Sequence, residues 1–195
     1  CNWELQGFGE YAYGRWYTVK GQRPSDETGI YRYKFDVPKS WAGQRVKIFF
    51  DGVMTDAEII INGKPAGELH QGGFYRFSYD ITELLNLGKK NQLEVKVAKE
   101  SANRSINAAE RKADWWLFGG IYRPVWLEVL PQIHMKHFVL SADHKGKFQA
   151  SIDMEGDAKG HEIVVSVRSL KDGKTVYTSN GQTTITHPIN NSGKE

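Results

Sequence analysis

The residues best suited to chemistry lie in one short stretch, where Asp114 is followed by Trp115 and Trp116. An ionised carboxylate accepts two strong, oriented hydrogen bonds, which suits neighbouring sugar hydroxyls. An indole offers a flat apolar surface on which one face of a pyranose can stack. Asp114 is therefore the leading candidate for a binding residue. The alternative interpretation is a capping or surface aspartate.

The two tryptophans belong to an aromatic cluster that continues through Phe118, Tyr122 and Trp126. Packing in the core of a sheet is the first interpretation of such a cluster, and a platform for a sugar is the second. Neighbouring residues of a strand point to opposite faces. One of Trp115 and Trp116 can therefore lie in the core while the other faces a substrate cleft or another domain.

The sequence does not contain the residue patterns of several common kinds of catalytic or metal site. Glycoside hydrolysis needs two carboxylates about 5 to 9 Å apart, and the acidic residues occur in no recognisable acid or nucleophile motif. Cys1 is the single cysteine and the histidines are scattered, which predicts neither a disulfide nor a zinc site. The sequence also has no nucleophile elbow and no phosphate-binding glycine loop before a helix. We predict no catalytic residue, no metal and no cofactor.

The composition is that of a globular protein and excludes several classes. The chain has 195 residues, of which 39% are hydrophobic and 25% are charged, so disorder is not expected. No apolar run is long enough for a membrane helix. The net charge of +3 does not indicate a nucleic-acid surface. The length is too short for a (β/α)₈ barrel, which needs about 250 residues.

Alternation of apolar and polar residues with period two predicts strands that must position these side chains. It is clearest in 30–37, 74–80 and 92–97 and is typical of half-buried antiparallel strands. Further strands are predicted at 45–50, 57–62, 121–130, 137–141, 147–154, 162–169 and 174–178.

Short polar pairs between these strands predict tight turns, and helices are almost absent. Asn62-Gly63, Asp172-Gly173 and Asn180-Gly181 supply the positive φ that a hairpin turn requires. The one helix candidate is 82–87, a connector of one or two turns. The polar run 99–112 is predicted to be a loop.

A change of composition at Pro131 predicts two domains. All six tryptophans and eight of the nine tyrosines precede it. We predict an all-β chain, with a jelly-roll β-sandwich in 1–131 and an immunoglobulin-like β-sandwich in 132–195. The second domain has about five predicted strands where that fold needs about seven. It is therefore expected to be truncated or completed by something else.

Three stretches in chain order resemble the non-catalytic front part of glycoside hydrolase family 2, which contains β-galactosidases, β-glucuronidases and β-mannosidases. The first, 2–9, is similar to the family opening N-W-x-x-x-G. The second, 28–82, contains matches to G-x-Y-R, F-x-G-V, V-N-G, G-G-Y and F-D-I-T. The third, 114–125, resembles D-x-W/F followed by G-G-I-Y-R-x-V.

The resemblance implies a jelly-roll sugar-binding domain, an immunoglobulin-like domain and a catalytic barrel with two glutamates. The barrel is absent from this chain, as is the strand-forming sequence that usually precedes the first motif, so both ends are expected to be cut. Asp114 would reach into the active site of the barrel and touch the sugar, and in some β-galactosidases the matching aspartate lies near a monovalent cation. Where galactosidases carry a sugar-binding asparagine in V-N-P-P-F, this chain has Lys20-Gly21. Lys20 would suit an anionic sugar, or it is an exposed loop residue.

The leading hypothesis is thus the inactive N-terminal part of a β-glycosidase that hydrolyses O-glycosyl bonds. Its partners would be a β-linked glycoside and the catalytic barrel of the same polypeptide, with no nucleic acid and no membrane. The site residues would be Asp114, Trp115, Trp116 and Lys20. A periplasmic or secreted location is favoured for a bacterial glycosidase. The alternatives are a stand-alone carbohydrate-binding module and a structural sandwich that mediates assembly.

Overall fold

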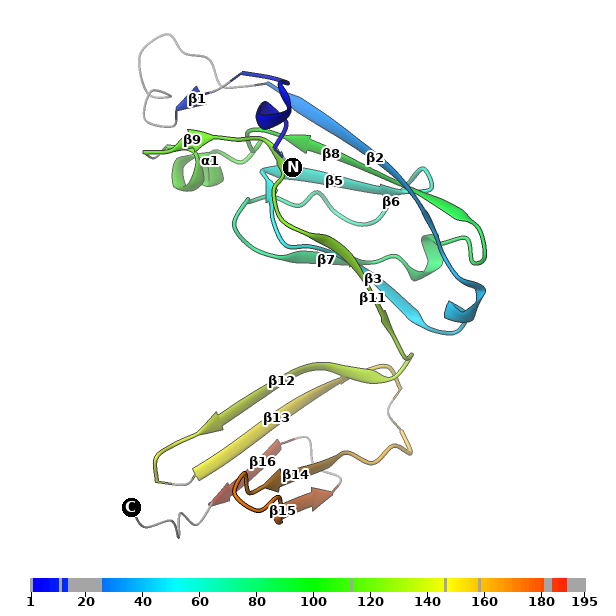
Figure 1. Cartoon of the computed structure of the whole chain (residues 1–195), viewed down its shortest axis with the longest axis vertical. Coiled ribbons are helices and arrows are strands. Elements are labelled where there is room, and N and C mark those ends of the chain that lie inside the picture. The colour runs from blue at the N-terminus through cyan, green and yellow to red at the C-terminus, as the bar shows by residue number, and fades with distance from the viewer. Residues whose placement is uncertain are drawn as a thin grey trace. The chain divides into compact units, whose positions relative to one another are not determined.

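The computed structural model describes residues 2–10, 12–13, 26–112, 114–145, 147–157, 159–180 and 184–188. The chain forms two compact units, unit 1 (Cys1–Val129) and unit 2 (Leu130–Glu195), and strands dominate both (Figure 1). The prediction of an all-β chain built from sandwich-like sheets is confirmed. Within the described ranges, no helix is long and apolar enough to cross a membrane.

The larger sheet of unit 1 is antiparallel and has the strand order β2-β8-β5-β6. Its strands are β2 (Thr28–Asp36), β8 (Lys90–Ala98), β5 (Asp56–Ile61) and β6 (Lys64–Pro65). Tyr31 lies opposite Val95, which in turn lies opposite Ile59, so all three side chains share one face. The hairpin between β5 and β6 turns at Asn62 and Gly63, whose φ angles are 52° and 81°. The predicted Asn-Gly turn is confirmed.

The second sheet of unit 1 has the order β11-β3-β7. Its strands are β11 (Val125–Leu130), β3 (Arg45–Phe50) and β7 (Phe77–Asp80). Two short antiparallel pairs complete the unit, β10 (Gly120–Ile121) with β4 (Val53–Met54) and β1 (Ala12–Tyr13) with β9 (Trp116–Leu117).

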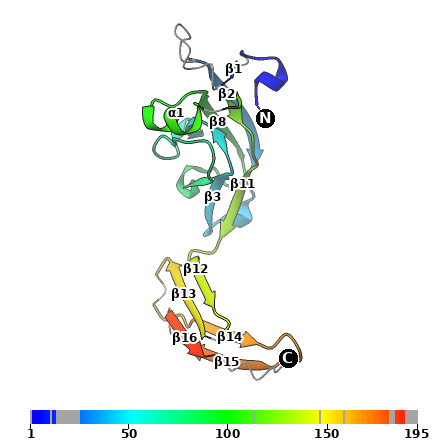
Figure 2. The ribbon, with the colours of Figure 1, turned by 90° about the vertical axis from the view of Figure 1, so that its left-hand side faces the viewer.

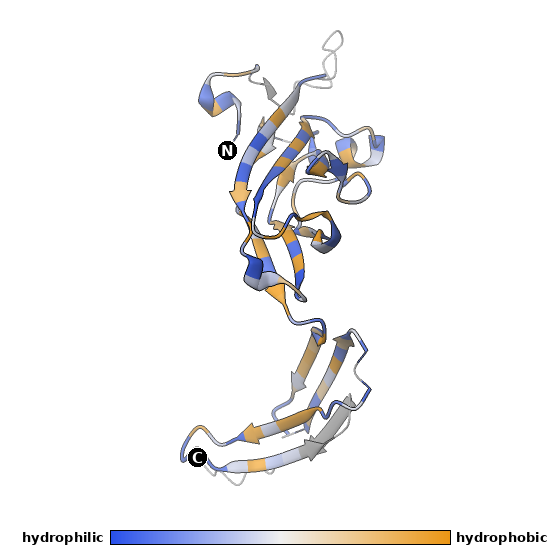
Figure 3. Ribbon diagram, turned by 90° about the vertical axis from the view of Figure 1, so that its right-hand side faces the viewer, coloured by the Kyte–Doolittle hydropathy of each residue, from blue (hydrophilic) through white to orange (hydrophobic). Residues whose placement is uncertain are grey.

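The core of unit 1 is built from the inward-facing residues of both sheets. Ile59, Val95 and Val97 come from the larger sheet, and Ile48 and Phe50 come from the second, each at most 2% exposed. Alternating orange and blue bands along the strands show the same pattern in Figure 3. Burying one face of each strand removes apolar surface from water, which is the main stabilising contribution to such a sandwich.

Three predicted elements of unit 1 differ from the structure. The alternation in 74–80 predicts one strand, but only Phe77–Asp80 forms β7. The predicted strand 121–130 is broken into β10 and β11, with Pro124 in the break. Proline has no N–H to donate to a ladder, which favours an interruption there. The predicted helix 82–87 is a single 3₁₀ turn, η4 (Thr82–Leu84).

The α-helix of unit 1 was not predicted. The polar run after β8 contains α1 (Arg104–Glu110), which is capped by Asn103 accepting a hydrogen bond from the Ser105 N–H. The helix and the β1–β9 pair lie at the same end of unit 1 (Figures 1 and 2). This helix carries residues that organise the candidate site.

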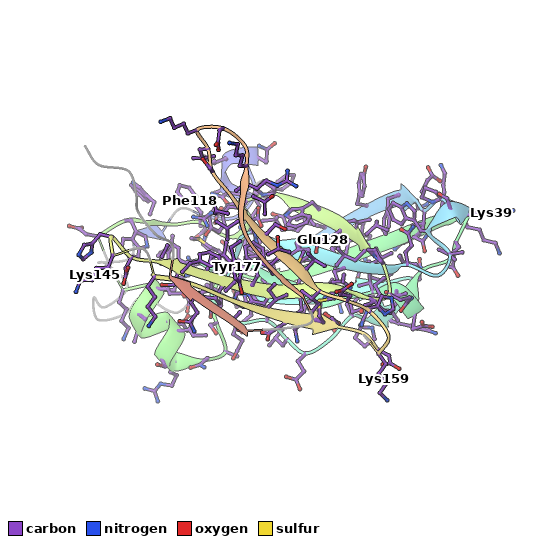
Figure 4. All side chains as sticks on the ribbon, turned by 90° about the horizontal axis from the view of Figure 1, so that it is seen from below. Lys39, Phe118, Glu128, Lys145, Lys159 and Tyr177 are labelled. Carbon is purple, nitrogen blue, oxygen red and sulfur yellow. The ribbon has the colours of Figure 1, made fainter. Side chains whose placement is uncertain are left out.

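Unit 2 contains two small antiparallel sheets. One has the order β12-β13-β16, with β12 (His134–Ala142), β13 (Lys147–Glu155) and β16 (Thr184–Pro188). The other pairs β14 (Val164–Arg168) with β15 (Thr175–Asn180). Strands were predicted at all of these places except β16. Lys145 and Lys159 extend outward from turns of this unit, whereas Tyr177 on β15 is half-buried (Figure 4).

The core of unit 2 is small. Ala150 and Ile152 of β13 are buried, but Phe138 and Leu140 opposite them on β12 are more than half exposed. The predicted turn at Asp172-Gly173 is confirmed, because Gly173 has a φ of 70° between β14 and β15. The predicted turn at Asn180-Gly181 lies partly outside the described residues.

Candidate functional site

The segment with the predicted site residues joins α1 to β9. Asp114 is exposed, and the side chains of Trp115 and Trp116 are 42% and 53% exposed. The interpretation that one of the tryptophans lies in the core is therefore wrong. β9 is only two residues long and pairs with β1, with Trp116 opposite Tyr13, so it forms no layer over the core. All three candidate side chains are accessible at one end of unit 1.

Arg111 holds both ends of this segment. Its side chain is buried, and its guanidinium donates hydrogen bonds to the backbone carbonyls of Lys99 and Phe118. The Nε to Lys99 distance is 2.9 Å and the Nη2 to Phe118 distance is 3.0 Å. The side chain of Phe118, whose carbonyl accepts this second hydrogen bond, is labelled in Figure 4. Burial lowers the pKa of Arg111, while nearby carboxylates act in the opposite direction. One side chain thus ties the backbone before α1, at Lys99, to the backbone after Asp114, at Phe118.

Glu4 anchors the far side of the same segment. Its carboxylate is fully buried and accepts from the Gly119 N–H at 2.9 Å and 3.1 Å through its two oxygens. A side chain at Gly119 would collide with the ring of Trp3, and Gly120 has a φ of 105°. Glycine suits both positions, because it allows the close approach at Gly119 and the positive φ at Gly120.

Lys99 forms a largely buried ionic network with Glu4 and Glu27, and its backbone carbonyl accepts from Arg111. Its ammonium lies 2.8 Å from Glu4 Oε1 and 2.8 Å from Glu27 Oε2, and it donates to the Glu10 carbonyl at 2.5 Å. Paired and hydrogen-bonded charges of this kind are what a protein interior tolerates.

Acidification is expected to weaken this network through Glu27. Burial alone would raise the pKa of the Glu27 carboxyl, but hydrogen bonds from Lys99 and from the Glu10 N–H outweigh it and hold the pKa below its ordinary value. Such a carboxyl stabilises the fold above its unfolded-state pKa, and this contribution is lost as the pH falls through the folded-state pKa. As the pH is lowered from the unfolded-state pKa of Glu27 through its folded-state pKa, we expect the urea midpoint to fall less steeply for Glu27→Gln than for wild type.

The matched control is Glu94→Gln, which removes a carboxylate paired at 2.7 Å with the exposed Arg32. Its midpoint should follow the wild-type pH dependence closely, because exposed ion pairs contribute little. Equal slopes for Glu27→Gln and wild type would contradict the role of Glu27.

The remaining aromatic residues of the predicted cluster mainly pack. Trp126 stacks on Phe49 at 4.2 Å between ring centroids and donates to Asp51 at 3.3 Å. Tyr122 donates its hydroxyl hydrogen to the Gly73 carbonyl at 2.6 Å. Lys20 lies outside the described residues.

A cavity of about 590 Å³ lies beside the network, between the N-terminal segment and β2. Trp3, Phe8, Glu27 and Tyr31 are among its described lining residues, whereas Asp114 is not. Among the described residues, no group of three or more histidine, cysteine or acidic side chains is placed to hold a metal ion.

Comparison with known proteins identifies the family of this domain. Residues 1–131 match the description "Glycosyl hydrolases family 2, sugar binding domain". The chain therefore belongs to glycosyl hydrolase family 2, as its motifs indicated.

Its relatives include named glycosidases. A β-galactosidase of Thermoanaerobacter pseudethanolicus is 35% identical over 68% of this chain and 18% of its own length. A putative β-glucuronidase of Formosa agariphila is 29% identical over 65% of this chain and 17% of its own length. The chain thus spans about a fifth of the length of these relatives.

Solved structures show the same arrangement of strands. A β-glucuronidase of an uncultured Clostridium species has a TM-score of 0.65 and 30% identity, over 81% of this chain and 28% of its own. A β-glycosidase from Bacteroides vulgatus has a TM-score of 0.65 and 28% identity, over 88% of this chain and 23% of its own.

Proposed function

We propose that this chain is the non-catalytic N-terminal part of a β-glycosidase that hydrolyses O-glycosyl bonds. Residues 1–131 would form its jelly-roll sugar-binding domain, and 132–195 would form part of an immunoglobulin-like domain. The observation that carries the proposal is Asp114, which is exposed on a family 2 sugar-binding domain. The named glycosidases among its relatives support the same reaction class.

The geometry suits a residue that orients a substrate. Arg111 and Glu4 hold the backbone after Asp114, at Phe118 and Gly119, which favours a defined position for the carboxylate when it accepts hydrogen bonds from sugar hydroxyls. The nucleophile and the general acid would come from the catalytic barrel. Trp115 and Trp116 would supply apolar contact beside the carboxylate, and Lys20 would approach an anionic group of the sugar.

The test compares the 195-residue chain with the polypeptide encoded when the reading frame is continued through a catalytic barrel. Calorimetry with β-galactosides and β-glucuronides should show no binding heat for the chain alone, and chromogenic assays should show no hydrolysis. The extended polypeptide should hydrolyse at least one of these glycosides. Binding heat for the chain alone would instead support a stand-alone carbohydrate-binding module. Hydrolysis by the chain alone, or none by the extended polypeptide, would refute the proposal.

A further inference from the structure

We infer that Phe74 and Trp115 form an aromatic platform for the ring on the leaving-group side of the scissile glycosidic bond. This inference rests on the proposed function and adds a specificity-determining surface to the same site. The ligand would be a ring with a flat apolar face, either an aryl group or a second pyranose.

The two side chains meet at the accessible end of unit 1. Their ring centroids are 6.3 Å apart and their planes are inclined by 84°, which is an edge-to-face contact. Phe74 is 45% exposed and Trp115 is 42% exposed, so each ring keeps surface available for a ligand. Trp115 directly follows Asp114 in the chain, so the backbone that carries half of the platform adjoins the candidate sugar-binding residue.

The loop that carries Phe74 is held rigidly by its own carbonyl groups. The Gln71 carbonyl accepts from the Tyr75 hydroxyl at 2.6 Å, and the Gly73 carbonyl accepts from the Tyr122 hydroxyl at 2.6 Å. The Gly72 carbonyl lies 2.9 Å from His70 Nε2, which must carry the hydrogen because a carbonyl only accepts. Three successive carbonyls before Phe74 therefore each accept a hydrogen bond from a side chain, which restrains the loop.

Consecutive residues at the end of α1 hold the two halves of the platform. Glu110 accepts from the Gly73 N–H at 2.8 Å and thereby fixes the loop of Phe74. Arg111 fixes the segment of Trp115 through the Phe118 carbonyl. Two exposed aromatic rings from distant parts of the sequence are thus pre-organised by one short helix, which favours a binding role over incidental exposure.

The chemistry of this surface determines what it can recognise. A phenyl ring offers no conventional hydrogen-bond donor or acceptor, so Phe74 cannot distinguish the configurations of sugar hydroxyls. It can bind by stacking and dispersion contact only. Such a surface suits the variable ring beyond the glycosidic bond, whereas the hydrolysed sugar is recognised through polar groups such as Asp114.

The test uses Phe74→Ala in the extended polypeptide with phenyl, disaccharide and methyl β-glycosides of the same sugar. We expect kcat/KM to fall about 3- to 10-fold for a glycoside with a ring as leaving group and to stay unchanged for the methyl glycoside. Phe74→Trp should retain the wild-type preference. The control is Tyr33→Ala, which removes an exposed aromatic ring from β2 and should change none of the three.

The pattern of losses identifies the ligand. A loss for the phenyl glycoside alone indicates an aromatic leaving group, and a loss for the disaccharide indicates a second sugar. Equal losses for all three, or no loss, would overturn the inference without affecting the proposed function. If the wild-type extended polypeptide hydrolyses none of the three glycosides, the proposed function itself is refuted.

A binding measurement on the 195-residue chain does not depend on turnover. At tens of millimolar phenyl β-glycoside, a concentration far above that of the calorimetric test, the indole N–H resonance of Trp115 should shift. The shift should shrink in Phe74→Ala and persist in Tyr33→Ala. An unshifted resonance in wild type would also overturn the inference.

Discussion

Replacing Lys99 with methionine is expected to lower the free energy of unfolding of unit 1 by about 3 to 5 kcal/mol. The substitution keeps much of the side-chain volume but removes the ammonium that lies 2.8 Å from Glu4. The Glu4 carboxyl group has no exposed surface, so it would be left in the interior without the ammonium that pairs with it. Removing one partner of a buried pair costs much more than the pair itself contributes.

The measurement is urea unfolding followed by tryptophan fluorescence, which reports on unit 1 because all six tryptophans precede Pro131. The control is Lys96→Met on β8, where the pair with Glu58 is 3.1 Å long and both side chains are about 40% exposed. That change should cost less than about 1 kcal/mol. Glu4→Gln combined with Lys99→Met should recover part of the loss. Equal losses for the two lysine variants would contradict the buried network.

Replacing Asp114 with alanine in the extended glycosidase is expected to lower kcat/KM by about 2 to 4 kcal/mol of transition-state stabilisation. This corresponds to about 30- to 1000-fold. The physical reason is the loss of a charged hydrogen bond to the substrate within a closed active site, where water no longer substitutes for it. Because Asp114 is exposed in unit 1, the same change should leave the urea midpoint nearly unchanged.

Steady-state kinetics with the preferred glycoside provides the measurement. Asp36→Ala is the matched control, since Asp36 is an exposed aspartate at the opposite end of β2. Its kinetics should equal those of wild type. Unchanged kinetics for Asp114→Ala would reject its role in substrate recognition.

Much of the fold could be predicted from alternation because each strand buries one face. The residues of 92–97 illustrate this, since Leu93, Val95 and Val97 are all buried on β8. The turn at Asn62 and Gly63 could be predicted because few residue types adopt positive φ readily. These signals depend only on neighbouring residues, so they can be recognised in a single sequence.

The organisation of the site was harder to predict because it depends on long-range pairing of charges. Continuing the alternation of β8 by one step places Lys99 on the inward face, and this signal could have indicated a buried lysine. Nothing local indicates that Glu4 or Arg111 would be its neighbours. The helix α1 was missed because its sequence has little apolar periodicity and its residues are largely exposed. Trp115 precedes β9 and Trp116 begins it, and both are exposed, which composition does not predict.

The hydrogen bond between Glu4 and Gly119 joins residues 115 positions apart. On a ribosome, the first turn of unit 1 is therefore made long before the backbone groups that receive its carboxylate. The Glu4 side chain is expected to stay hydrated until the last strands emerge, because burying a carboxylate without its hydrogen-bonding partners is unfavourable. Completion of unit 1 is consequently a late event in synthesis, and nascent chains that stop before Gly119 should remain sensitive to proteases.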